Sequence, residues 1–299
     1  MKHYLVTATV VAALALAGCE KDETNSEPVA ARFTAGIAGQ GLSRAAGTAW
    51  TSGDQIGVTG TSGSKAYLNI MYDAAESASE AGFTVVDKAK AIYFQDANEV
   101  EFKAYYPFAG TEETAATAVS KTIGTNDQTP AGQPDIDFLY GTGTGSKAAP
   151  TVAFTFTHRM SKLTLTFLAG ADTKLSDMTG YTVKGLKMEG TFDPATGIAT
   201  ADASASATDL TMTTSGITGD SYTSSLILFP QGAAANSVKV EVTLGGQVFT
   251  APLAITDNEL EASNNYTFNV TVNKTGLSIT PAKIEDWGNK GKTDVPAEM

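Results

Sequence analysis

The sequence has 299 residues, with 32 Asp and Glu against 20 Lys and Arg, and a formal net charge of -12. A surface of that charge repels phosphate backbones, so we expect no nucleic-acid partner. Hydrophobic residues make up 42% of the chain and charged residues only 17%, which allows a buried core and disfavours long solvated helices. A chain of this length suggests two domains or one large β domain.

The first 18 residues are typical of an export signal. Lys2 and His3 precede an almost wholly apolar run from Leu5 to Ala17, which is shorter than the roughly 20 residues that a membrane-spanning helix needs. The run ends at Leu16-Ala17-Gly18-Cys19, which resembles the lipobox of bacterial lipoproteins, whose cysteine is acylated and becomes the new N-terminus. An ordinary signal peptide is the alternative. Cys19 is the only cysteine, so no intramolecular disulfide can form.

Residues 19–31 are predicted to form an acidic tether. The cluster Glu20-Lys21-Asp22-Glu23 resembles the signal that sends lipoproteins of the Bacteroidetes phylum to the outer face of the outer membrane. A simple solvated linker explains the same residues.

A first strand is expected at residues 32–39, with Phe33, Ala35 and Ile37 on one face. The Gly-, Ser- and Ala-rich segment that follows contains Arg44 and precedes Trp50. Exposed connections of this composition are preferred sites of proteolysis. A solvated loop arginine is the alternative for Arg44.

Alternating apolar and polar residues predict strands along most of the remaining chain. In the clearest case Val238, Val240, Val242 and Leu244 alternate with polar residues before a turn at Gly245-Gly246, which predicts a hairpin with one exposed face. Further strands are expected in the segments "VEFKAYYPF", "TVAFTFTH", "KLTLTFLAG", "SSLILFPQG" and "NYTFNVTVNK". The region from Met71 to Lys88 lacks the alternation. Many short antiparallel strands favour β-sandwiches, with helix a small minority.

The stretch "GTGTGSKAAP", residues 141–150, is the best candidate break. We therefore expect an N-terminal domain at 32–148 and a C-terminal domain at 149–299, with the signal at 1–18 and the tether at 19–31.

The chain offers little catalytic chemistry. His158 is the only histidine left once the signal is removed, and no G-x-S-x-G nucleophile elbow or zinc ligand set accompanies it. We expect His158 to be a hydrogen-bonded residue at the start of a domain strand. "GTGTGS" is interpreted as a turn rather than a nucleotide-binding loop. Asp135 and Asp137 could supply two calcium oxygens, but the rest of a calcium loop is missing. We predict no catalytic residue, metal or cofactor.

Several segments in a fixed order carry a resemblance to a known family. These are "TAWTSGDQIGV", "FKAYYPF", "DFLYGTGT", "FTFTHRMSKLTLTF", "LKMEGTFDPATG", "LILFPQ" and "ITPAKIEDWG". Together with the lipobox they resemble the fimbrillin-like lipoproteins of Bacteroidetes, the pilins of type V pili. The resemblance implies an all-β protein with two transthyretin-like antiparallel β-sandwich domains. It also implies palmitate on the exported lipoprotein, an outer-membrane location before maturation, and assembly with other pilin subunits into an adhesive surface fimbrium.

In that family an arginine-directed cut after the first strand removes the strand with the lipid and opens an acceptor groove. Arg44 fits this role better than Arg32, because a cut at Arg32 would leave the strand in the groove. A strand from another subunit would then fill the groove. The C-terminal segment is the available donor, with Leu277, Ile279 and Ile284 as its apolar groups, while Pro281 suits an edge or a bulge.

A second reading is a tethered surface lipoprotein that binds a glycan as a monomer and exposes an aromatic platform. Trp50 and Trp287 both lie in runs that read as structural, which gives that reading little support. A secreted hydrolase is a third reading, disfavoured by the scarcity of catalytic residues. The resemblance does not distinguish a stalk from a tip or an anchor subunit, and it names no receptor.

Overall fold

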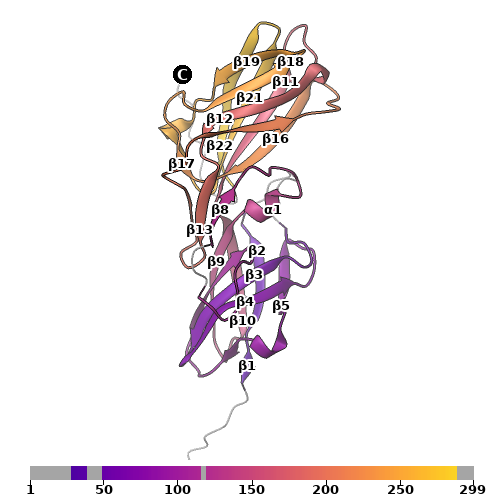
Figure 1. The fold of residues 1–299 in the computed structure, drawn as a ribbon. Helices are drawn as coiled ribbons and strands as arrows, with labels where there is room; N and C mark the ends of the chain where they lie inside the picture. Colours follow the sequence, from indigo (N-terminus) through magenta and orange to yellow (C-terminus); the bar gives the residue numbers. More distant parts are fainter. Residues whose placement is uncertain (1–27, 39–48, 116–118, 288–299) are drawn as a thin grey trace, which may run out of the picture.

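A computed structural model describes residues 28–38, 49–115 and 119–287 of the chain. The protein is all-β and has two β-sandwich domains that follow one another along the long axis of the molecule. The N-terminal domain is indigo to magenta and the C-terminal domain is red to yellow in Figure 1. The prediction of an all-β fold with two sandwiches is confirmed.

The N-terminal domain is built around a sheet that closes on itself in the order β10-β2-β5-β4-β3-β7-β9. Its strands are β2 (Arg32–Ile37), β3 (Gln55–Ser62), β4 (Lys65–Ala74), β5 (Glu80–Val85), β7 (Val100–Tyr106), β9 (Leu139–Gly145) and β10 (Thr151–His158). All neighbours in this sheet are antiparallel except β2 and β10, which run parallel. The first and last strands of the domain are therefore side by side. A short ladder of β1 (Val29–Ala30) and β6 (Tyr93–Phe94) pairs two residues of the predicted tether.

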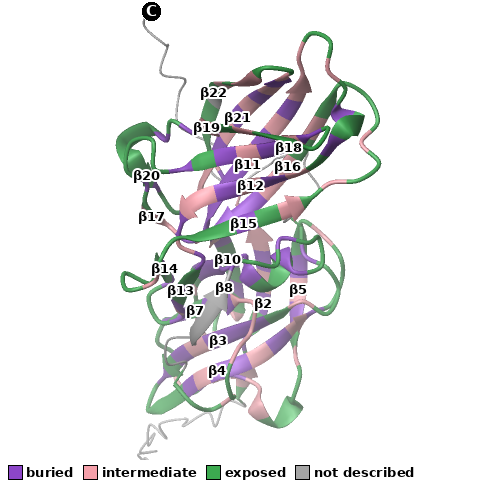
Figure 2. Ribbon diagram, turned by 45° about the horizontal axis from the view of Figure 1, so that its top comes forward, coloured by how far each residue is buried: buried purple, intermediate pink, exposed green. Residues whose placement is uncertain are grey.

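The C-terminal domain packs two four-stranded sheets face to face. The first sheet contains β16 (Ser221–Leu228), β11 (Ser161–Ala169), β21 (Asn264–Asn273) and β22 (Gly276–Asp286), and the second contains β15 (Thr208–Thr213), β12 (Met178–Leu186), β18 (Lys239–Leu244) and β19 (Gln247–Pro252). Alternate residues of both sheets form one core, seen as the striped strands in Figure 2. Here β11 and β21 form the parallel pair.

The hairpin of β18 and β19 follows its sequence pattern closely. Val238, Val240 and Val242 are fully buried, and Leu244 is 9% exposed. Gly245 and Gly246 have φ angles of 56° and 79°, the left-handed conformation that a two-residue hairpin turn requires. The predicted hairpin is confirmed.

The two domains share a third sheet and a third core. β8 (Val119–Gly124) pairs with β13 (Glu189–Asp193), which pairs in turn with β14 (Ile198–Ala201). Beside this sheet Phe138 of the first domain stacks on Phe192 of the second, with ring centroids 4.7 Å apart. The predicted boundary between residues 148 and 149 lies before β10, a strand of the N-terminal sheet. We propose Arg159 and Met160 as the junction, because β11 opens the second domain.

The glycine run at residues 141–145 is a strand and not a turn, contrary to the sequence interpretation. It forms most of β9 and pairs with β7 along its length. A Cβ at Gly143 would lie 2.8 Å from the carbonyl oxygen of Ala153 on β10, and one at Gly141 would lie 2.9 Å from that of Thr155. Glycine therefore allows close approach of β10 to β9.

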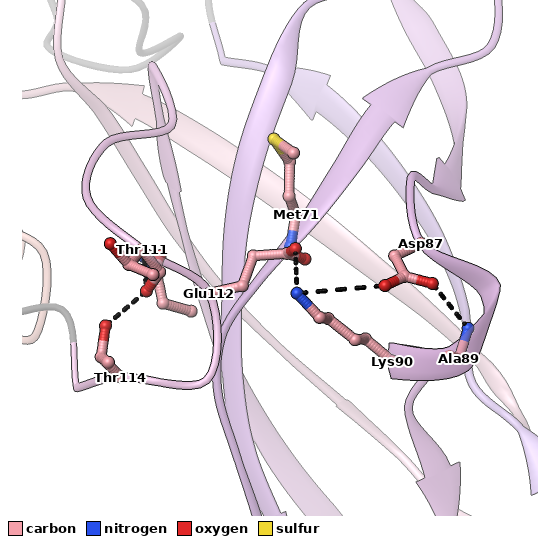
Figure 3. A network of polar contacts seen from close by, with 8 residues as sticks. Met71, Asp87, Ala89, Lys90, Thr111, Glu112 and Thr114 are labelled. Atoms are coloured by element: carbon pink, nitrogen blue, oxygen red, sulfur yellow. Dashed lines mark hydrogen bonds and ion pairs between the residues drawn. The ribbon is translucent and has the colours of Figure 1, made fainter.

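The remaining elements are short connections. They are η1 (Lys88–Lys90), α1 (Gln133–Ile136), η2 (Leu175–Asp177), η3 (Thr256–Asn258), and the ladder of β17 (Gln231–Gly232) with β20 (Glu259–Leu260). Figure 3 shows how the loop after β7 is fastened to β4: Glu112 accepts from the Met71 main-chain N–H at 2.9 Å and from Lys90 Nζ at 2.7 Å. Asp87 lies 4.0 Å from the same ammonium group. This network ties η1 and the loop to the wall of the N-terminal domain.

Candidate functional site

β2 is enclosed on both sides by other strands. It pairs antiparallel with β5, from Phe33 opposite Phe83 to Gly36 opposite Glu80, and parallel with β10, from Arg32 beside Thr151 to Ile37 beside Phe156. A strand in this position satisfies two rows of main-chain groups at once. Removing β2 would leave two unpaired strand edges and an open strip of core between them.

The inward face of β2 is the one that the sequence predicts. Phe33 is 2% exposed and Ala35 is 1% exposed, while Ile37 is partly buried against the same core. The Phe33 ring stacks on Phe154 at 5.4 Å and meets Tyr72 edge-on at 4.9 Å. An aromatic side chain in such surroundings contributes several kcal/mol to stability, about 3–5 kcal/mol by truncation to alanine. β2 is thus a full member of the core.

Trp50 forms part of the wall around β2. Its indole Nε1 donates to the Ala35 carbonyl oxygen at 2.8 Å. The ring meets Phe83, Tyr106 and Phe156 edge-on, at centroid distances of 5.1, 5.6 and 5.1 Å. This hydrogen bond could not be predicted from the sequence, because residues 35 and 50 share no periodic spacing.

Of the two arginines considered for proteolytic maturation, Arg32 lies within the described residues. It is the first residue of β2, its side chain is exposed, and its main-chain N–H donates to the Pro150 carbonyl at 2.9 Å. Main chain that is paired in a sheet is a poor fit to a protease, which binds its substrate in an extended form. Arg44 and the lipidation candidate Cys19 lie outside the described residues.

The candidate donor residues lie in β22, which the structure pairs with β21 from Asn273 opposite Gly276 to Asn264 opposite Asp286. Leu277 and Ile279 are partly buried and pack against the core of the C-terminal domain. Ile284 is 42% exposed. β22 is an edge strand, and its register shifts between Lys283 and Pro281, so the expectation that Pro281 suits an edge or a bulge is confirmed.

The end of β22 is fixed at the junction of the domains. Trp287, 8% exposed, stacks on His158 with ring centroids 3.9 Å apart and planes within 10°. His158 is fully buried at the end of β10, not at the start of a strand, and its Nδ1 lies 2.8 Å from Asp137 Oδ1. Lys162 lies 5.4 Å from the Trp287 ring, and burial lowers the pKa of its ammonium group, with Asp137 opposing the shift. Asp137, considered above for calcium, instead positions His158.

Truncating Trp287 to alanine is expected to lower the free energy of unfolding by about 3–5 kcal/mol, because a large buried ring is lost together with its stacking contact to His158. Trp287→Phe keeps a ring against His158 and should cost less than half as much. Urea denaturation of the two variants measures both. A loss below about 1 kcal/mol for Trp287→Ala would show that the stack contributes little.

A small cavity lies beside the end of β2. It has a volume of about 100 Å³ and lies among Ile37, Trp50, Asp54, Tyr106 and Asp137. Burial raises the pKa of the Asp54 carboxyl, which also accepts from the Thr51 N–H. Sites for drug-sized ligands are typically about 300–1,000 Å³, so this cavity is too small for such a ligand. Within the described ranges no three His, Cys, Asp or Glu side chains gather as a metal site, and no helix is long and apolar enough to cross a membrane.

Comparison with known proteins finds one family repeatedly. A family model described as fimbrillin-like matches residues 43–287. A Bacteroides uniformis protein named as fimbrium subunit Fim1C is 29% identical over 310 residues, covering 97% of this chain and 98% of its own. A crystal structure of a cell adhesion protein from Bacteroides ovatus has 30% identity and a TM-score of 0.75, covering 88% of this chain and 99% of its own. A second, from Bacteroides uniformis, has 26% identity and a TM-score of 0.70, with the same coverage.

Proposed function

We propose, because this chain belongs to the fimbrillin-like family, that it is a structural subunit of a bacterial surface fimbria, exported as a lipoprotein, matured by proteolysis and assembled by donor-strand exchange. Its partners are other pilin subunits, and it is located at the cell surface. The family is one of structural fimbrial subunits and not of enzymes. The role is therefore adhesion through a polymer rather than catalysis.

The position of β2 is the observation that carries the proposal. β2 is near the N-terminus, lies between β5 and β10, and is joined to Trp50 through the segment that contains Arg44. A cut after Arg44 leaves β2 attached to the N-terminal segment with Cys19, and separates it covalently from the rest of both domains. When β2 then leaves, the body has an apolar groove with two unpaired edges, which a strand from another molecule can fill.

The C-terminal strand of a second subunit is the proposed occupant. β22 ends the described chain, lies at a sheet edge, and carries Leu277, Ile279 and Ile284. An edge strand loses one row of main-chain hydrogen bonds when it leaves its own sheet, and it gains two rows when it enters the groove of another subunit. This net gain of hydrogen bonds favours strand exchange between subunits.

The proposed lipid anchor is tested separately. Cys19→Ala removes the thiol that would be acylated, so incorporation of labelled palmitate should fall to background and surface delivery should fail. A single acyl chain binds membranes only marginally, and stable anchoring takes two or more. Labelling that persists in Cys19→Ala would place the anchor on another residue.

The assembly proposal is tested on the purified precursor with an arginine-specific protease, followed by N-terminal sequencing, electron microscopy and gel electrophoresis in SDS. We expect an N-terminus at Ala45, fibres, and an SDS-resistant ladder. A chain cut at this place that stays monomeric contradicts the role of a polymerising subunit. That result, with a retained anchor and glycan affinity, would favour a tethered glycan-binding lipoprotein.

A further inference from the structure

We infer that Ile284 of β22 is a contact residue between subunits: it is exposed on its own domain and becomes buried when β22 fills the groove of a second copy of this chain. The inference rests on the proposed function, which supplies the donor strand and the groove. It adds the side chain by which the groove distinguishes this strand from others.

Ile284 lies on the core face of its sheet. In the β21–β22 ladder it is directly opposite Tyr266, which is buried. Directly opposite residues of an antiparallel pair have their side chains on the same face of the sheet. Leu277 and Ile279 share this face, because their partners in the ladder are buried as well. The three apolar side chains of β22 therefore face the same way.

Only the first part of this face is covered in the subunit. Leu277 and Ile279 pack against the core of the C-terminal domain, whereas Pro281 is exposed and Ile284 is 42% exposed. Single apolar residues on a protein surface are common and need no explanation. Ile284 differs from such residues because it lies on the core face of an edge strand. Its own domain thus leaves the second part of that face open.

A bulge in β22 keeps Ile284 on this face. Pro281 is paired with Phe268 and Lys283 with Thr267, so β22 has one extra residue where β21 has none. Without the extra residue, strict alternation would turn Ile284 outward and Lys283 inward. Inside a sheet, proline is found essentially only at bulges. The bulge therefore belongs to the donor strand in its own sheet and in the groove alike.

The groove and the donor strand have equal numbers of inward positions. β2 and the residue before it present four: Ala31, Phe33, Ala35 and Ile37. The core face of β22 also presents four: Leu277, Ile279, Pro281 and Ile284. Inward side chains recur at every second residue, and the bulge adds one residue to the run in β22. In the register that fills all four positions, Ile284 lies at one end of the groove, whichever way the strand runs.

A donor strand that runs as β2 does places Ile284 where Ile37 lies. An isoleucine then replaces an isoleucine, and the side chain packs against the core of the N-terminal domain as Ile37 does. The cavity of about 100 Å³ beside Ile37, lined also by Trp50 and Tyr106, leaves room at this end of the groove. The part of Ile284 that is exposed in the subunit becomes buried there, which favours the inserted state.

The test variant is Ile284→Thr in the full chain. Threonine keeps the β-branched shape, and its hydroxyl is hydrated on the surface but lacks a partner inside an apolar groove. The equilibrium constant for unfolding of the uncut chain should change less than about threefold. After cleavage, the protein concentration needed for fibres should rise about tenfold. Ile198→Thr is the matched control, because Ile198 is 59% exposed on β14, which is neither donor nor groove.

Peptides separate this inference from the proposed function. A labelled peptide of residues 28–38 is exchanged into the groove of the cut full chain and displaced by a peptide of residues 276–287, with Ile284 or with Ile284→Thr. We expect the threonine peptide to bind about tenfold more weakly. Equal affinities would overturn the inference and leave the donor assignment standing, and so would equal fibre formation by the Ile284→Thr and Ile198→Thr chains. If unlabelled 28–38 displaces the label and neither 276–287 peptide does, the donor assignment is wrong and the inference falls with it.

Discussion

Arg44→Ala is expected to leave the precursor uncut and monomeric. While the chain is intact, β2 competes for its groove at the effective concentration of a tethered segment, on the order of millimolar for a short flexible linker. A donor strand at micromolar concentration is then outcompeted about a thousandfold. The cut removes this advantage, and β2 can be replaced. Fibres and the SDS-resistant ladder should therefore fall below detection in Arg44→Ala.

Arg32→Ala is the matched control, since it removes an arginine from the opposite end of β2. The Arg32 side chain is exposed, and substitutions at such positions usually change stability by less than about 0.5 kcal/mol. Cleavage and fibres should match those of the unmodified chain. Fibres formed equally by Arg44→Ala would remove cleavage at this residue from the mechanism, and their loss in Arg32→Ala would move the cut to Arg32.

Local patterns predicted the strands that have one core face. The β18–β19 hairpin could be predicted fully, because strict alternation and a Gly-Gly turn are both local signals. The region from Met71 to Lys88 showed no alternation, yet it holds the end of β4 and all of β5. In β5 the inward positions are Ala81 and Phe83, and the period is hidden because the inward Ala81 and its neighbour Gly82 are both small and differ little in hydrophobicity. The composition of β5 therefore prevented its recognition from the sequence, although its geometry is regular.

Pairing between distant segments could not be predicted in the same way. The parallel contacts of β2 with β10 and of β11 with β21 join the first strand of each domain to one that lies roughly a hundred residues later. Gly141 and Gly143 were taken for a turn because the backbone that presses on them, β10, is not their sequence neighbour. Glycine signals close approach as well as turns, and only the tertiary structure distinguishes the two.

In the candidate site too, some features follow from local sequence patterns and others depend on contacts between distant residues. The core face of β2 and the apolar residues of β22 follow from alternation. The Trp50 bond to Ala35 and the stack of Trp287 on His158 depend on rings that meet across strands. The sequence pointed to the C-terminal segment as a donor strand, and the structure pairs the first part of this segment, Gly276–Asp286, with β21. Leu277 and Ile279 suit either sheet, because an edge position and a groove demand the same alternation.

A disulfide that joins β22 to β21 is therefore expected to prevent polymerisation, because β22 could no longer leave its sheet to act as the donor strand. Thr271 and Ser278 are opposite each other in the β21–β22 ladder, and directly opposed residues of antiparallel strands have Cα atoms about 4.5–5.5 Å apart. That spacing suits a disulfide. The pair Thr271→Cys and Ser278→Cys is made in a Cys19→Ala chain, so that it has no other thiol partner. When oxidised, the cut protein should remain monomeric, and reduction should restore the ladder.

A second disulfide in the same sheet separates the donor role from a general effect of cross-linking. Thr166 and Thr223 join β11 to β16 with their Oγ1 atoms 3.1 Å apart, and neither strand has to leave its sheet in the proposed exchange. Thr166→Cys with Thr223→Cys should polymerise alike when oxidised and when reduced. If the β21–β22 lock polymerises as well as this control under oxidation, β22 is not the strand that passes between subunits, and the donor must come from residues 288–299.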